Sequence, residues 1–360
     1  MNDSSWGASP SAGYRDPGDP GRSPSAGPVY EAADAAQTRP MPLPSEGVPS
    51  EGAGRDDDHT RRPAPADPPR DDRSRQSDSR QPETPSPGRK RAGRDLPAAI
   101  GVGLGLGAVI VASLFLVKEA FVAVVAAAVV VGLWELTSRL SERKGVNVPL
   151  VPLAVGGAAM VVAGYVRGAE GAWVLLALTA LAMLLWRMAE PPENYLRDVT
   201  AGLFTLFYVP FLATFVALLL AADDGPWRVL TFLVLTIVSD TGAYAVGWRF
   251  GRRKLAPRIS PGKTREGLLG AVASTMIAGA LCMQFLIDGG QWWQGLLLGL
   301  AVAASATLGD LGESMIKRDL DIKDMGTLLP GHGGIMDRLD SLLPTAPVVW
   351  LLLVVFVGAG

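Results

Sequence analysis

The sequence predicts an all-α, polytopic integral membrane protein with about nine transmembrane helices behind a disordered N-terminal tail. Two observations predict this class. From Leu96 to the end of the chain, apolar runs of about 20 residues follow one another, which is the length that a helix needs to cross a bilayer. Before Leu96 the composition shifts to Pro, Ser, Gly, Asp and Arg, with few large apolar residues. The chain therefore divides into a tail, residues 1–95, and a transmembrane domain, residues 96–360.

The tail is predicted to be disordered and cytoplasmic. Its 14 Lys and Arg residues are interspersed with 16 Asp and Glu residues, and it has too little apolar surface to offset the entropy lost on folding. It lacks the compact apolar run of a signal peptide. Mixed charge favours a solvated tether over a segment that binds anionic lipid, and we expect no nucleic-acid partner.

The charges between the predicted spans indicate their orientation. Lys and Arg are concentrated before the first span and in the loops after the even-numbered spans, most of all after the sixth. Because cationic loops stay in the cytoplasm, this alternation predicts a cytoplasmic N-terminus, an external C-terminus and two cytoplasmic motif-bearing loops, in the cell membrane. The spans cover residues 97–117, 119–137, 148–166, 171–188, 199–221, 227–247, 267–288, 292–311 and 342–359.

The small number of cysteines and histidines excludes two kinds of site. The single cysteine, Cys282, lies inside an apolar run, so neither an internal disulfide nor a thiolate metal site is available. Of the two histidines, His59 is in the tail, which excludes a multi-histidine site. The other, His332, lies in a glycine-rich turn with Gly333 and Gly334, where the backbone can approach a ligand closely. We expect His332 to bind substrate or to hold this turn.

A carboxylate interrupts the sixth span near its cytoplasmic end, in Ser239-Asp240-Thr241. A charged group inside a span is costly, so Asp240 is expected to face the bundle interior and to have a partner. Three polar side chains in a row favour a functional site over the alternative, a structural hydrogen bond to a neighbouring helix. We interpret Ser239 and Asp240 as substrate-binding candidates.

The loop after this span contains Ser260-Pro261-Gly262-Lys263-Thr264-Arg265. An NTPase P-loop requires a glycine five residues before Gly262, where this chain has Pro257, and no strand is predicted before the motif, so we exclude that reading. At the start of the seventh span, Lys263, Thr264 and Arg265 form a candidate phosphate cradle of two cations and free backbone N–H groups. An ordinary cationic loop on the cytoplasmic side explains the same residues equally well.

Carboxylates from two separate segments form a candidate metal pair. Asp310 lies at the end of the eighth span, and Asp337 precedes the ninth. Mg²⁺ takes oxygen ligands and usually binds only one or two protein carboxylates beside substrate phosphates. Asp340, three residues after Asp337, is expected on the same face of a helix. The alternative for Asp337 and Asp340 is that acids are favoured in the first turn of a helix.

The segment from Ser314 to Ser341 connects the last two spans and combines many charged residues with a glycine-rich turn. From Ser314 to Asp340 its pattern is Ser-x-Ile-Lys-Arg-x4-Lys-Asp-x-Gly-x2-Leu-Pro-x-His-Gly-Gly-Ile-x-Asp-Arg-Leu-Asp. This pattern resembles, at every fixed position, the signature of the phosphatidate cytidylyltransferases, or CDP-diacylglycerol synthases. Residues 239–244 and 260–264 are also similar to this family, and the resemblance spans about residues 97–360.

The resemblance implies an enzyme of phospholipid biosynthesis that transfers the cytidylyl group of CTP to phosphatidic acid, giving CDP-diacylglycerol and pyrophosphate. It implies a homodimer among membrane lipids, Mg²⁺ held by Asp310 and Asp337, and a monovalent cation such as K⁺ beside it. The catalytic candidates are Asp310, Asp337, Lys323 and Asp324. The substrate-binding candidates are Ser239, Asp240, Lys263, Thr264, Arg265, Ser314, Lys317, Arg318, His332, Gly333, Gly334, Arg338 and Asp340.

The residue types fit this chemistry independently of the resemblance. Nucleotidyl transfer to a phosphate brings two anions together, so it needs in-line positioning and charge neutralisation more than a base. The cations expected to bind the phosphates of CTP and of the lipid are Lys263, Lys317, Arg318 and Lys323.

Three other functions compete with this interpretation. A transporter is compatible with the intramembrane Asp240, but the chain has no evident internal repeat. A CDP-alcohol phosphatidyltransferase would have an Asp-Gly-x2-Ala-Arg pattern, which is missing here. The third alternative is an inactive membrane scaffold whose tail is its working part.

Overall fold

The computed structural model describes residues 96–326, 328 and 333–359. All of them belong to one unit of the chain, Glu83–Gly360. The tail predicted at residues 1–95 lies outside the described residues, as do residue 327, residues 329–332 and residue 360. His332 is therefore among the candidate site residues that the structure does not describe, and the disorder of the tail stays a prediction.

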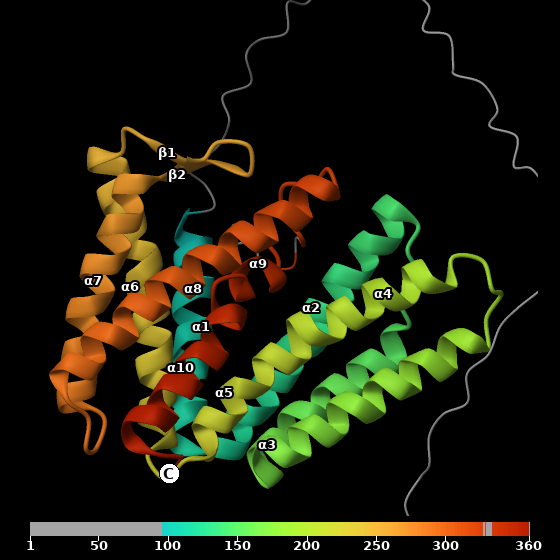
Figure 1. Cartoon of the computed structure of the whole chain (residues 1–360), viewed down its shortest axis with the longest axis horizontal. Coiled ribbons are helices and arrows are strands. Elements are labelled where there is room, and N and C mark those ends of the chain that lie inside the picture. The colour runs from blue at the N-terminus through green and yellow to red at the C-terminus, as the bar shows by residue number, and fades with distance from the viewer. Residues whose placement is uncertain (1–95, 327, 329–332, 360) are drawn as a thin grey trace, which may run out of the picture. The chain divides into compact units, whose positions relative to one another are not determined.

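The described chain is mainly a bundle of helices (Figure 1). Apolar side chains can face lipid directly. Lipid offers no hydrogen bonds to backbone N–H and C=O groups, and a helix satisfies these groups internally. The helices are α1 (Leu96–Leu116), α2 (Lys118–Lys144), α3 (Leu150–Met188), α4 (Tyr195–Leu206), a π-helical turn (Phe207–Phe211), α5 (Leu212–Ala221), α6 (Gly225–Phe250), α7 (Arg265–Phe285), α8 (Trp292–Asp319), α9 (Met336–Leu339) and α10 (Leu342–Val357).

Seven helical segments among the described residues are long and apolar enough to cross a membrane. This confirms a helical, multi-pass membrane architecture. The sequence predicted nine spans, two more than these seven. The first predicted span corresponds to α1, which is not among the seven, and the third and fourth predicted spans together form the single helix α3.

The long helix α3 folds back on itself at Gly168. Gly168 has φ 66° and ψ −156°, a conformation that interrupts the helix and that only glycine adopts readily. A Cβ at Gly156 would lie 2.2 Å from Oγ1 of Thr179, although a straight helix would separate these two residues by about 34 Å. The two halves of α3 are therefore packed against each other as an antiparallel pair.

A two-stranded antiparallel hairpin follows α6, and the all-α prediction did not include it. Its strands are β1 (Lys254–Ala256) and β2 (Ser260–Thr264), with Lys254 opposite Thr264 and Ala256 opposite Ser260. The segment predicted as a phosphate-binding loop is therefore itself a strand. Strand β1 precedes the motif, contrary to one ground for excluding a P-loop, but the exclusion still holds by spacing, because Pro257 stands where a P-loop needs a glycine.

The eighth predicted span ends too early. Helix α8 continues past residue 311 to Asp319, so residues expected in a loop lie on a helix. This extension places Asp310, Glu313 and Lys317 at positions i, i+3 and i+7, which share one helix face. Figure 1 shows that the C-terminal end of α8 and the hairpin lie at the same end of the bundle, away from the C-terminus.

Glycines bring α7 very close to its neighbours. A Cβ at Gly295 or Gly299 of α8 would lie within 2.2 Å of a backbone carbonyl oxygen of α7. A Cβ at Gly242 of α6 would lie 2.1 Å from Oγ of Ser274. Small residues allow such contacts between membrane helices. The result is a closely packed group of α6, α7 and α8, from which the hairpin extends.

Candidate functional site

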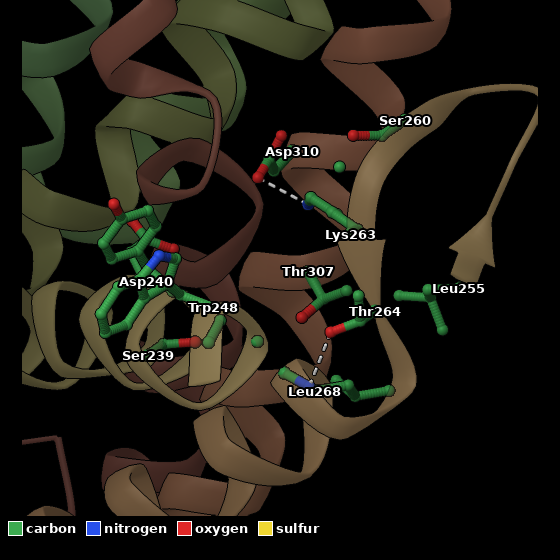
Figure 2. Close-up of a pocket in the computed structure, with 15 residues that line it drawn as sticks. Ser239, Asp240, Trp248, Leu255, Ser260, Lys263, Thr264, Leu268, Thr307 and Asp310 are labelled. Atoms are coloured by element: carbon green, nitrogen blue, oxygen red, sulfur yellow. Dashed lines mark hydrogen bonds and ion pairs between the residues drawn. The ribbon is translucent and has the colours of Figure 1, made fainter. Parts of the chain in front are cut away.

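A cavity of about 530 Å³ lies where α6, the hairpin, the start of α7 and α8 meet (Figure 2). This volume is in the usual range for small-molecule sites. Its polar lining comes from Ser239, Asp240, Ser260, Lys263, Thr264, Thr307 and Asp310. Its apolar lining includes Tyr244, Trp248, Leu255 and Leu268. The sequence motifs around Asp240, Lys263 and Asp310 therefore meet at one cavity, although they come from three segments.

An ion pair spans the cavity between the hairpin and α8. Lys263 Nζ lies 2.5 Å from Asp310 Oδ2, and the two side chains are 23% and 36% exposed (Figure 2). The neighbouring Thr264 caps α7, since its Oγ1 accepts a hydrogen bond of 3.1 Å from the N–H of Gly267. The N-terminus of α7 therefore reaches the cavity, with Thr264 as its cap and Lys263 directed at a carboxylate.

Asp240 has a hydrogen-bonding partner, as expected for a carboxylate inside a span. The hydroxyl of Ser341 donates to Asp240 Oδ2 at 3.1 Å, and Asp240 remains exposed to the cavity while Ser239 is buried. The carboxyl groups of Asp310 and Asp340 lie within electrostatic range of Asp240. Three acids from α6, α8 and the turn before α10 are thus gathered beside the cavity.

A second ion-pair group lies further along α8. Lys317 Nζ is 2.5 Å from Glu313 Oε2 and 2.7 Å from Asp337 Oδ1. Glu313 is fully buried, and its Oε1 has no hydrogen-bond partner among the described residues. Lys317, only 17% exposed, therefore joins α8 to α9 through Asp337, while its pair with Glu313 lies within α8.

The carboxylate of Asp337 is surrounded by protein donors. The N–H of Met325 donates to both of its oxygens, at 3.0 and 3.1 Å, and the N–H of Gly334 donates to Oδ2 at 2.7 Å. With Lys317 on Oδ1, both oxygens of this buried group are engaged. Asp337 thereby holds together α8, α9 and the segment that begins at Met325.

The other candidates are less enclosed. Lys323, Asp324, Arg265 and Arg338 are exposed, and among the described residues none of them has a side-chain ion pair. Arg318 is also exposed, and its Nε donates to the carbonyl of Ile259 in the hairpin turn at 3.3 Å. Half-buried positions are occupied by Ser314, Asp340 and Gly333, and Gly334 is buried.

The predicted metal pair is not joined in this structure. Asp310 pairs with Lys263 and Asp337 pairs with Lys317, so each carboxylate has its own lysine. Within residues 96–326, 328 and 333–359, no group of three or more His, Cys, Asp or Glu side chains is arranged to hold a metal ion. A metal site at Asp310 and Asp337 remains a prediction.

Two buried acids that contact the signature region, Glu135 of α2 and Glu313 of α8, are not among the predicted site residues. Both are carboxylates within predicted spans or directly after one, the same signal that identified Asp240. Glu313 also lies three residues after Asp310, which would have placed both on one helix face had α8 been predicted to continue. Ser341, the partner of Asp240, carried no signal of its own.

Comparison with known proteins agrees with the motifs that meet at this site. The model of the cytidylyltransferase family matches residues 97–356. The phosphatidate cytidylyltransferase of Mycobacterium leprae is 43% identical over 279 residues, which cover 73% of this chain and 89% of that protein. The phosphatidate cytidylyltransferase of Mycobacterium bovis is 41% identical over 284 residues, covering 75% and 92%.

A shorter match is the uncharacterized protein YnbB of Escherichia coli, 43% identical over 162 residues, which cover 44% of this chain and 54% of that protein. The family match extends over nearly all of the described residues and includes every motif that lines the cavity or surrounds Asp337. This chain belongs to the cytidylyltransferase family.

Proposed function

We propose that this protein is a phosphatidate cytidylyltransferase, which uses CTP and phosphatidic acid to make CDP-diacylglycerol and pyrophosphate. The main support is the family match over residues 97–356 together with the complete signature between Ser314 and Asp340. Relatives above 40% identity carry the name of this enzyme. Family membership also favours a transferase over the transporter and scaffold alternatives.

The reaction makes and breaks one bond at phosphorus. An oxygen of the lipid phosphate attacks the α-phosphorus of CTP, and the bond from that phosphorus to the bridging oxygen breaks, so that pyrophosphate leaves with the electron pair. The attacking phosphate is already ionised, and the site must therefore orient and neutralise rather than remove a proton.

The two lysines of the site differ in what they can do in this reaction. Lys263 lines the cavity and is partly exposed, so it can exchange Asp310 for an entering phosphate. Lys317 is enclosed by Glu313 and Asp337, and we propose that it holds Asp337 in position instead of binding phosphate directly. Arg318 and Lys323 are exposed and remain available to the triphosphate or to the lipid headgroup.

Mg²⁺ dependence belongs to the same proposal, and the residues present fit a divalent cation. Carboxyl groups outnumber lysines where the two ion-pair groups meet, and a hard cation would neutralise the excess. We propose Asp310 as a ligand, with Asp337 available only when Lys317 releases it; K⁺ would bind nearby. Bound Mg²⁺ would neutralise phosphate charge. The acids are Asp240, Asp310, Glu313, Asp337 and Asp340, and the lysines are Lys263 and Lys317.

The membrane arrangement is proposed on the charges and the helices together. The reversal of α3 at Gly168 would give two crossings, and α1 would give another, which supports nine spans. We propose a cytoplasmic N-terminus and cavity, an external C-terminus, a location in the cell membrane and a homodimer. The cavity at the ends of α6 and α8 would then be open to CTP from the cytosol and to lipid from the inner leaflet.

The test is a transfer assay with the purified full-length chain in phosphatidylcholine vesicles. With CTP labelled at the α-phosphate, phosphatidic acid and Mg²⁺, we expect labelled CDP-diacylglycerol and one pyrophosphate per product. Chelation by EDTA should abolish product formation, and Mg²⁺ should restore it, with KCl titrated separately. Labelled substrate that crosses the vesicle without any CDP-diacylglycerol would refute the proposal in favour of a transporter.

A further inference from the structure

The carboxylate of Glu135, in the middle of α2, has no part in the chemistry proposed above. Glu135 is buried, with only 3% of its surface exposed. Oε2 accepts a hydrogen bond of 2.8 Å from the N–H of Met336, while Oε1 has no hydrogen-bond partner among the described residues. Burial of an acid with so few partners is costly, so its contacts across the fold are informative.

Two glycines of the signature lie directly against this carboxylate. A Cβ at Gly326 would be 2.1 Å from Glu135 Oε1, and a Cβ at Gly334 would be 2.5 Å from Oε2. Any side chain at either position would displace the carboxylate or the backbone. Glu135 therefore touches the chain on both sides of the interval from 326 to 334.

The same face of α2 contacts this part of the chain at two further points. Arg139, one turn after Glu135, donates from Nε to the carbonyl of Met325 at 2.8 Å. A Cβ at Gly132, one turn before, would be in ordinary contact with side chains of Leu339 and Met336, at 3.5 and 3.7 Å. This face of α2 is thus fitted to five residues of the signature region, namely Met325, Gly326, Gly334, Met336 and Leu339.

The backbone that this face supports is the backbone that holds Asp337. Met325 donates its N–H to Asp337 and its carbonyl accepts from Arg139. Gly334 donates its N–H to Asp337 and lies against Glu135. Asp337 in turn holds Lys317 of α8. A continuous chain of contacts therefore runs from α2 through the signature segment to the site.

We infer that Glu135 is a positioning residue for cytidylyl transfer: it anchors Met336 and the glycines at 326 and 334, and so sets the place of Asp337. This inference rests on the proposed function. Glu135 does not line the cavity of about 530 Å³. Its effect is on the geometry of a group that acts after substrates are bound.

The first test compares Glu135→Ala and Glu135→Gln, with Glu119→Gln as a matched control on an exposed position of the same helix. We expect Glu135→Ala to lower kcat about 100-fold with little change in either KM, since small displacements of catalytic groups cost about this much. Glu135→Gln should recover most of kcat, because an amide oxygen can still accept the N–H of Met336. An unchanged kcat in Glu135→Ala, or equal losses in both variants, would overturn the inference.

A double-mutant cycle tests the contact itself. Gly326→Ala should cost less activity in the Glu135→Ala background than in the wild type, because the carboxylate that its methyl group meets is gone. Gly334→Ala is the control, since its methyl group would still lie 2.7 Å from the backbone N of Gly326. Additive losses for Gly326→Ala and Glu135→Ala would contradict the proposed contact.

Limited proteolysis separates this inference from the proposed function. Trypsin cleavage after the exposed Lys323 should be faster in Glu135→Ala than in the wild type, and unchanged in Glu119→Gln. This readout does not depend on the reaction. If the wild type made no CDP-diacylglycerol, the proposed function would fail, but the cleavage rate would still test whether Glu135 holds the signature region in place. Equal cleavage in wild type and Glu135→Ala would overturn the inference.

Discussion

Asp310 and Asp337 were predicted as equivalent members of one metal pair, and their surroundings differ sharply. Asp310 lines the cavity, is 36% exposed and, among the described residues, forms an ion pair with Lys263 alone. Asp337 has a side chain only 6% exposed, with Lys317 and two backbone N–H groups on its oxygens. The first carboxylate is open to a ligand, whereas the second is already part of the protein's own framework.

The difference teaches that an acid in a catalytic signature can serve the site in two ways. An open carboxylate can exchange its lysine for a cation or leave it to a phosphate at little cost to folding. An enclosed carboxylate cannot be removed without leaving buried donors unpaired. The variants below test this contrast between the open Asp310 and the enclosed Asp337.

The largest effect is expected for Asp310→Asn. Removal of the open carboxylate should lower CDP-diacylglycerol formation about 10³-fold, as expected for the loss of a metal-binding charge worth several kcal/mol. The free energy of unfolding should change by less than about 1 kcal/mol, because a partly exposed ion pair contributes little. The transfer assay measures the change in activity, and thermal unfolding in detergent measures the change in stability. Turnover near that of the wild type would refute the role of Asp310.

Asp337→Asn should reduce activity and stability together. We expect activity to fall about 100-fold and the free energy of unfolding to fall by about 2 kcal/mol, because the amide cannot accept from Lys317, Met325 and Gly334 at once. Thermal unfolding of both aspartate variants in the same detergent gives the comparison. Equal stability of Asp310→Asn and Asp337→Asn would remove the distinction between them.

Lys263→Met should have a smaller effect, confined to activity. We expect kcat/KM to fall about 10-fold to 100-fold, since a charge-assisted contact to phosphate is worth about 1.5–3 kcal/mol. Lys263→Arg, which keeps the charge, should retain more activity than Lys263→Met. Steady-state kinetics with CTP and phosphatidic acid varied in turn would show which KM rises. Identical kinetics for wild type and Lys263→Met would exclude a substrate contact.

Asp319→Ala should have the smallest effect. Asp319 is the last residue of α8 and pairs with Lys144 at 3.2 Å, with side chains 76% and 40% exposed. Exposed pairs of this kind contribute between about 0 and 1 kcal/mol. We expect activity within about twofold of the wild type and no measurable change in thermal unfolding. A large loss of activity would mean that the charge of an acid in the signature affects activity whether the side chain is exposed or buried.

The sequence by itself determined the membrane class, the family resemblance and the motifs that meet at the cavity. Span length and apolar composition are local properties, so they can be read along the chain without knowledge of the fold. The signature from Ser314 to Asp340 is equally local. The count of nine spans depends in part on α3, where the predicted break between two spans falls at Gly168, the residue at which the helix reverses.

Only the tertiary structure decided which acids are open and which are enclosed. The partners of Asp337 are Lys317, Met325 and Gly334, and the hydrogen-bond partner of Glu135, Met336, lies 201 residues further along the chain. The length of α8 and the hairpin before α7 likewise depend on packing rather than on local hydropathy. The physical reason is that the state of a buried carboxylate is set by the donors that the fold brings to it, and sequence spacing does not contain those contacts.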